Sequence, residues 1–233
     1  PFNTRSTVAT LTPASSATSS IVALTMKPSK RTRRFCQFLI GVYQKGFVKG
    51  GRRPKALRHS TVMQITIPLN DAQFGPAEAV IAETDGLVAS AFRYGTGVAA
   101  LRIRNRVGEI VCLPFQGQQI ADATFHGRRL TMRSMFGEPP KATHYLGNSG
   151  GFLVHCGATA MGNPSAEDNH PLHGELPNLP YQSASLMIGE DERGPWMGMT
   201  GVGRYTIAFT HNYEARPVLK LHADSGRIDA EIE

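Results

Sequence analysis

Short apolar runs separated by turn residues recur along the chain from Gly86 onward. Residues 98–105 alternate between apolar and polar side chains, turn at 106–109, and return through 109–115, which predicts a β-hairpin. Further strands are predicted at 119–125, 128–132, 183–188, 196–199, 203–210, 217–221 and 227–231. No long segment has the 3.6-residue period of an amphipathic helix. Short strands with Gly and Pro between them predict an all-β fold, a sandwich or a barrel.

Charge divides the chain into two parts. The whole sequence has a formal net charge of +7, but residues 1–62 hold 12 Lys and Arg and no acidic residue, so residues 63–233 carry a net −5. A Ser-rich, Arg-rich segment without acids is typical of a transit peptide, of a nucleic-acid-binding arm, or of sequence translated ahead of a start at Met63. We favour the last interpretation. Residues 1–62 are predicted to be disordered or spurious, and residues 63–233 to form the folded domain.

The composition excludes several classes of protein. The chain is 41% hydrophobic, which is enough for a core, and no apolar run reaches the ~18 residues of a membrane span. Its three cysteines show no Cys-x-x-Cys spacing, so a reducing, cytoplasmic compartment is expected. The acidic folded part argues against a nucleic-acid partner.

Titratable side chains gather in and just before a Gly- and Pro-rich block at 157–180. They are His155, Cys156, Glu167, Asp168, His170, His173 and Glu175. Imidazole, with a pKa near 6.5, is the natural proton donor or acceptor at neutral pH. The alternative interpretation is structural, since polar loop residues commonly cap turns and bind backbone groups. Because so many titratable groups converge here, the block is the predicted functional site.

Four stretches carry a resemblance to a known superfamily. They are Leu113–Ile120, Leu130–Phe136, His155–Gly162 and His170–Pro177, the last reading His-Pro-Leu-His-Gly-Glu-Leu-Pro. From Leu101 to about Glu233 the chain resembles the aldose 1-epimerase (galactose mutarotase)-like superfamily. The resemblance implies a large antiparallel supersandwich, a sugar as the small-molecule partner, and no metal or other cofactor.

The resemblance also implies a reaction and roles for residues. Mutarotation needs a base for the anomeric hydroxyl and an acid for the ring oxygen, so that the sugar ring opens and recloses as the other anomer. Leu172-His173-Gly174 matches the motif that supplies an active-site histidine, which makes His173 the predicted acid. The expected substrate-binding residues are His155, Arg133, His170, Glu175 and His211.

The chain also departs from the superfamily pattern. The segment of mutarotases that carries a sugar-binding Arg is replaced here by Gly151–Cys156, and the second histidine and the glutamate base are expected beyond residue 233. We therefore expect a supersandwich truncated at its C-terminus that binds sugar weakly and turns over little. Exposed sheet edges would favour oligomers or aggregation.

Two other functions remain open at this point. A cupin-like, metal-dependent barrel enzyme would use His155, His170, His173 and Glu175 as ligands, although their spacing does not place them on one face of a strand. A non-catalytic carbohydrate-binding module is the other, because the fold does not fix the function.

Overall fold

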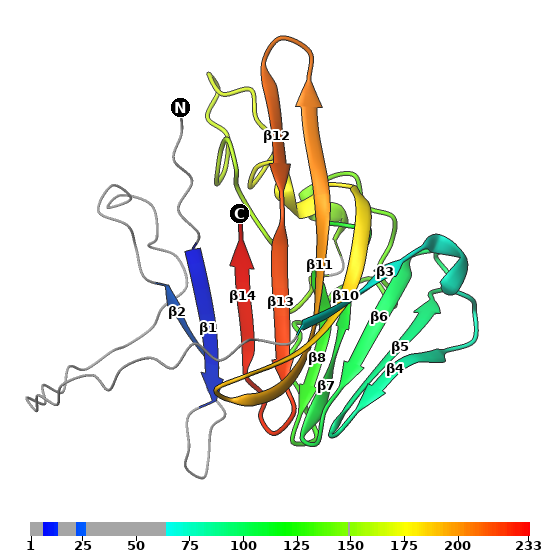
Figure 1. The fold of residues 1–233 in the computed structure, drawn as a ribbon. Coiled ribbons are helices and arrows are strands. Elements are labelled where there is room, and N and C mark those ends of the chain that lie inside the picture. Colours follow the sequence, from blue (N-terminus) through cyan, green and yellow to red (C-terminus); the bar gives the residue numbers. More distant parts are fainter. Residues whose placement is uncertain (1–6, 14–21, 27–63, 149) are drawn as a thin grey trace, which may run out of the picture.

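The computed structural model describes residues 7–13, 22–26, 64–148 and 150–233, and shows a β-sandwich (Figure 1). Its strands are β1 (Thr7–Pro13), β2 (Val22–Met26), β3 (Gln64–Leu69), β4 (Ala79–Thr84), β5 (Leu87–Arg93), β6 (Ala99–Arg104), β7 (Gly108–Cys112), β8 (Ile120–Phe125), β9 (Arg128–Arg129), β10 (Tyr181–Asp191), β11 (Gly194–Ile207), β12 (His211–Ala215), β13 (Pro217–His222) and β14 (Ile228–Ile232). The helices of the described part are three short 3-10 turns, η1 (Asp71–Gln73), η2 (Tyr145–Gly147) and η3 (Leu176–Asn178). The all-β prediction is confirmed.

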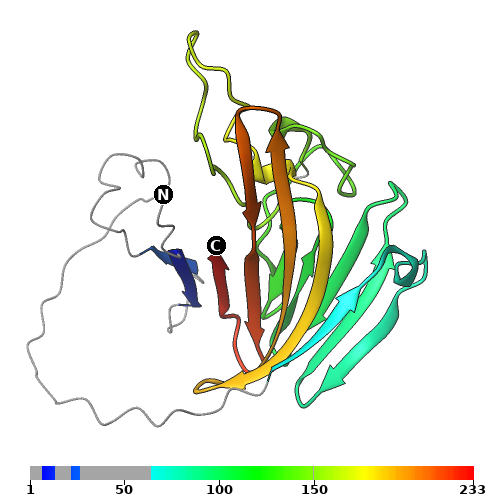
Figure 2. The ribbon, with the colours of Figure 1, turned by 45° about the horizontal axis from the view of Figure 1, so that its top comes forward.

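The strands form two antiparallel sheets. Sheet A has the order β2-β1-β14-β13-β11-β10-β3, with β12 paired to the far end of β11, and sheet B has the order β4-β5-β6-β7-β8-β9. Figure 2 shows sheet B against one face of sheet A and the long connections between β9 and β10 at the end where β12 lies. None of the described helices is long and apolar enough to cross a membrane.

Alternation along the strands produces the core between the sheets. In β6, Leu101 and Ile103 are fully buried while Arg102 and Arg104 point to the other face of the sheet. In sheet A the buried Leu186, Met199 and Leu219 lie in neighbouring strands at matching register and belong to the same cluster. The period of two in the sequence therefore marks one inner and one outer face on each sheet.

The longest strand corrects one prediction. The sequence predicted two strands, 196–199 and 203–210, but the structure has a single strand, β11, over Gly194–Ile207. Its internal glycines are places of close backbone approach, and not turns. A Cβ on Gly198 would lie 2.1 Å from the carbonyl oxygen of Leu219, and one on Gly203 would lie 2.6 Å from a methyl carbon of Leu179.

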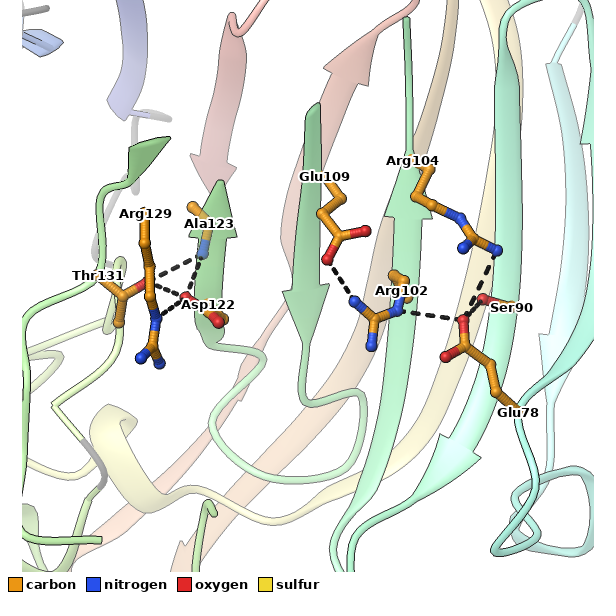
Figure 3. A network of polar contacts seen from close by, with 9 residues as sticks. All are labelled: Glu78, Ser90, Arg102, Arg104, Glu109, Asp122, Ala123, Arg129 and Thr131. Carbon is orange, nitrogen blue, oxygen red and sulfur yellow. Dashed lines mark hydrogen bonds and ion pairs between the residues drawn. The ribbon is translucent and has the colours of Figure 1, made fainter. Parts of the chain in front are cut away.

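Ion pairs cover much of the outer face of sheet B (Figure 3). Arg102 lies between two carboxylates, with its Nε 3.1 Å from Glu78 and its Nη1 against Glu109. Ser90, which is fully buried, donates to the same Glu78. These groups therefore satisfy one another's charges and hydrogen bonds on this face.

Part of the basic N-terminal segment is described. β1 pairs antiparallel with β14, with Thr7 opposite Ile232, and β2 pairs with β1. The rest of residues 1–62, predicted to be disordered or spurious, lies outside the described residues. Association of this chain through sheet edges stays a prediction.

Candidate functional site

Backbone pairing joins the two loop segments that carry three of the six predicted site residues. Gly157 and Gly174 form a parallel bridge, in which the Gly157 N–H donates to the His173 carbonyl at 2.8 Å. The His173 N–H in turn donates to the Gly162 carbonyl at 2.9 Å. Residues 155–162 and 173–175 therefore lie side by side, although they are well separated in the sequence.

His173 has an unusual backbone. Its φ is +61°, in the left-handed region that only a few per cent of non-Gly residues adopt, with Asn, Asp and His found there more often than the rest, and this costs roughly 1–2 kcal/mol. Gly174 follows at φ +80°, and a Cβ there would lie 2.3 Å from the carbonyl oxygen of Ala160 and 2.6 Å from that of Gly157. The His-Gly pair is thus fixed by the packing of the two segments. Strain of this kind, retained by the surroundings, is common at functional sites.

The His173 ring lies against Tyr145. The two ring centroids are 4.3 Å apart with the planes tilted by 55°. Burial raises the pKa of the Tyr145 phenol, and the neighbouring Cys156 adds to that shift. Burial also raises the pKa of the Cys156 thiol. Both groups beside His173 therefore remain protonated at neutral pH and cannot act there as bases.

Glu175 is directed away from solvent. The side chain is buried, and its carboxylate accepts hydrogen bonds from the Thr159 hydroxyl and, at 3.3 Å, from the Thr159 N–H. Burial and then the charge of Glu175 raise the pKa values of Tyr205 and Tyr213, which places this carboxylate beside the cluster at the β11–β12 end of sheet A. Glu175 thus binds Thr159 within the loop, beside this cluster.

Three predicted residues lie outside this pairing. His170 Nδ1 contacts the Pro171 carbonyl at 2.9 Å, and its Nε2 is 4.0 Å from Asp168, within a local turn. Arg133 is exposed and has no hydrogen bond or ion pair to a described residue. His211 opens β12 with its ring 6.0 Å from that of Tyr205. The backbone pairing joins the segments that carry His155, His173 and Glu175. His170 and His211 have the local contacts given above, and Arg133 has none among the described residues.

Comparison with known proteins places the chain in a family. The family model described as "Domain of unknown function (DUF4432)" matches residues 95–231, which include every predicted site residue. The chain belongs to this family. No curated protein matches it.

The DUF4432 chain is also similar in structure to a solved protein. The crystal structure of a "putative aldose 1-epimerase" from Klebsiella pneumoniae matches with a TM-score of 0.57 and 17% sequence identity, over 69% of this chain and 48% of that one. The likeness supports an epimerase-like β-sandwich fold. The chain spans about half the length of the solved protein.

Sequence reasoning missed the amides that hold the DUF4432 loops. Gln119 is buried, and its Nε2 donates to Pro177 at 2.6 Å and to Asn148 at 2.9 Å. Asn178 donates from its amide to the Ala142 carbonyl at 3.2 Å. The three glutamines within residues 116–119 could have indicated this, because buried side-chain amides almost always have hydrogen-bond partners.

Metal binding finds no support in the described part of the chain. Over residues 64–148 and 150–233, no three His, Cys, Asp or Glu side chains are grouped as a metal site requires. The four ligands of the cupin-like alternative do not form such a group.

His155 is a neutral imidazole in this fold. Burial lowers its pKa from 6.5 to about 4, against a smaller opposing effect of a backbone hydrogen bond with Gln118. Its Nε2 is buried and has no hydrogen-bond partner among the described residues. At neutral pH it therefore carries no proton to release as an imidazolium.

This pKa predicts a pH dependence of stability. Between about pH 6.5 and about pH 4 the unfolded state binds the His155 proton and the folded state does not, so the free energy of unfolding should fall as the pH is lowered through this window. Urea denaturation across this range would measure it. The variant His155→Gln should lose this contribution, and equal pH profiles for the two proteins would contradict the burial of His155.

Proposed function

We propose that this chain binds an aldose and promotes exchange of its anomers by acid–base ring opening, with His173 as the acid. The observation that carries the proposal is the strained His173 backbone, fixed by the Gly157–Gly174 pairing on an epimerase-like fold. The surrounding packing retains a strained backbone at His173, while its imidazole is only half-buried and is not part of the hydrophobic core. This combination supports a chemical role for the ring.

The proposed steps use few groups. A base removes the proton of the anomeric hydroxyl while His173 protonates the ring oxygen, and the bond between the anomeric carbon and that oxygen breaks. Rotation about the first carbon–carbon bond and reclosure give the other anomer.

The base comes from outside this cluster in our proposal. Tyr145 and Cys156, which lie near His173, stay protonated. The Glu175 carboxylate already accepts hydrogen bonds from Thr159. The expectation of a glutamate beyond residue 233 stays a prediction. Because only the acid is identified among the described residues, we expect slow exchange.

The test is exchange spectroscopy of galactose and glucose anomers at pH 7. We expect exchange above the buffer rate with the unmodified chain, and a reduction of about tenfold or more with His173→Asn. Asn tolerates the left-handed backbone and so keeps the loop conformation. Equal rates for the two proteins, or no exchange above buffer with either, would contradict the proposal.

A non-catalytic carbohydrate-binding role is the second candidate. It is favoured by the position of Glu175, whose carboxylate is buried and bound to Thr159. Sugar binding without anomer exchange would select it.

A further inference from the structure

The outer face of sheet A carries a row of side chains outside the loop site. Ser185 lies opposite Thr200, Thr200 opposite Val218, and Val218 opposite Glu231, across β10, β11, β13 and β14. Each of these residues alternates along its strand with core residues such as Leu186, which is fully buried. In Figure 2 this face of sheet A is the one turned away from sheet B.

Two hollows adjoin on this face. One of about 310 Å³ is lined by Ser183, Ser185, Thr200, Gly201, Val202, Arg216, Val218, Glu231 and Glu233. The other, of about 190 Å³, is lined by Asp191, Arg193, Val218, Lys220, Arg227, Asp229, Ala230 and Glu231. They share Val218 and Glu231, and we call the continuous depression the sheet A trough. Its larger part is at the lower end of the size range of small-molecule sites, which begins near ~300 Å³.

Several polar groups of the trough can form further hydrogen bonds. Among the described residues, the side chains of Ser183, Ser185 and Glu231 have no hydrogen-bond partner. The Thr200 hydroxyl donates to the Pro217 carbonyl at 2.8 Å, which leaves its oxygen free to accept. A ligand here would meet hydroxyl donors, hydroxyl acceptors and a carboxylate within one hollow.

The ionic lining is balanced. Four cationic side chains (Arg193, Arg216, Lys220 and Arg227) meet four carboxylates (Asp191, Asp229, Glu231 and Glu233). Asp229 is already held by Arg227 at 2.9 Å and Arg193 at 3.3 Å. Glu231 lines both hollows, which makes it the carboxylate at the centre. A phosphate or sulfonate placed there would face this negative charge, which has no ion-pair partner among the described residues. The lining therefore favours an uncharged ligand.

Two valines give the larger hollow an apolar floor, and one of them, Val218, also lines the smaller hollow. Val218 and Val202 are half-buried and provide a surface for C–H groups, while the rim binds hydroxyls. A neutral pyranose has C–H groups and hydroxyls on its surface and is the size of a single ring, so it matches this lining.

We propose that the sheet A trough is a binding site for a neutral sugar, with the Glu231 carboxylate accepting hydrogen bonds from its hydroxyls. The site is built from other residues than the His173 cluster. It does not depend on anomer exchange, because a sugar that cannot open its ring would bind equally well.

The test uses methyl α-glucopyranoside and methyl α-galactopyranoside, which cannot exchange anomers. Valine-methyl NMR of the full chain should show saturable shifts of Val218 and Val202 with at least one of them. Glu231→Gln, a nearly isosteric change at a partly exposed position, should weaken that binding about tenfold or more. Val218→Phe should abolish it by filling the hollow, and His173→Asn should leave it unchanged.

Other outcomes would overturn the proposal. The Val218 methyl resonances could stay unshifted with both glycosides. Glu231→Gln could leave the binding unaltered, or His173→Asn alone could abolish it. Glucose 6-phosphate that binds tenfold more tightly than the glycosides would contradict the neutral-ligand assignment. Should Val218→Phe fail to fold, Glu231→Gln still decides. Absence of anomer exchange with the glycoside shifts intact would reject the His173 mechanism and leave the trough standing.

Discussion

Gly174→Ala should lower the free energy of unfolding by roughly 2–5 kcal/mol and disrupt the loop site. The new Cβ would lie 2.3 Å from the Ala160 carbonyl oxygen and 2.6 Å from that of Gly157, and both obstacles are backbone atoms that cannot rotate away. The φ of +80° adds the strain of a left-handed Ala. Relief requires the Gly157–Gly174 bridge to open, which would release His173 from its position. Thermal or urea denaturation measures the loss.

A matched control lies in the same loop. Gly162 has φ +85°, and nothing lies within 4 Å of a Cβ built on it. Gly162→Ala should therefore pay only the backbone strain, about 1–2 kcal/mol. Equal losses for the two variants would show that the close packing of the loop segments at Gly174 is absent.

Ile103→Ala should cost about 2–5 kcal/mol, because it removes a fully buried side chain from the core between the sheets. Ile103→Val, which deletes one methylene, should cost about 0.5–1.5 kcal/mol. Urea denaturation of the variants gives both differences.

Ile65 supplies the control for this series. It lies on β3 with 57% of its surface exposed, so Ile65→Ala should change stability by no more than about 0.5 kcal/mol. A loss at position 65 equal to that at position 103 would mean that the two sheets do not enclose the core as described.

The strands of sheet B show what alternation alone can predict. Leu101 and Ile103 are buried and Arg102 and Arg104 are not, and β6, β7 and β8 lie close to their predicted ranges. β10 and β11 are longer than predicted, because the glycines within them were interpreted as turns. A sequence alone does not distinguish a Gly that turns the chain from a Gly that allows another backbone to approach. Gly198 does the second, against the Leu219 carbonyl. That distinction depends on tertiary packing.

The sequence indicated candidate residues for the site but not their arrangement. His173 and Glu175 are two residues apart, yet one ring packs on Tyr145 and the other side chain binds Thr159. Contacts with residues 16 or more positions away cannot be read from local spacing. The sheet A trough depends on the register of four strands, which sets Ser185, Thr200, Val218 and Glu231 in one row. No single stretch of sequence contains that row.

The most direct test of the central claim is to observe the His173 ring by NMR while galactose or glucose is added at pH 7. Binding against this imidazole predicts saturable shifts of its ring resonances, and transferred proton contacts between the ring and the sugar protons next to the ring oxygen. His170, held in its own turn at Pro171, should shift much less. His173 resonances that stay unmoved by either sugar at concentrations that saturate the trough would contradict the assignment of His173 as the acid.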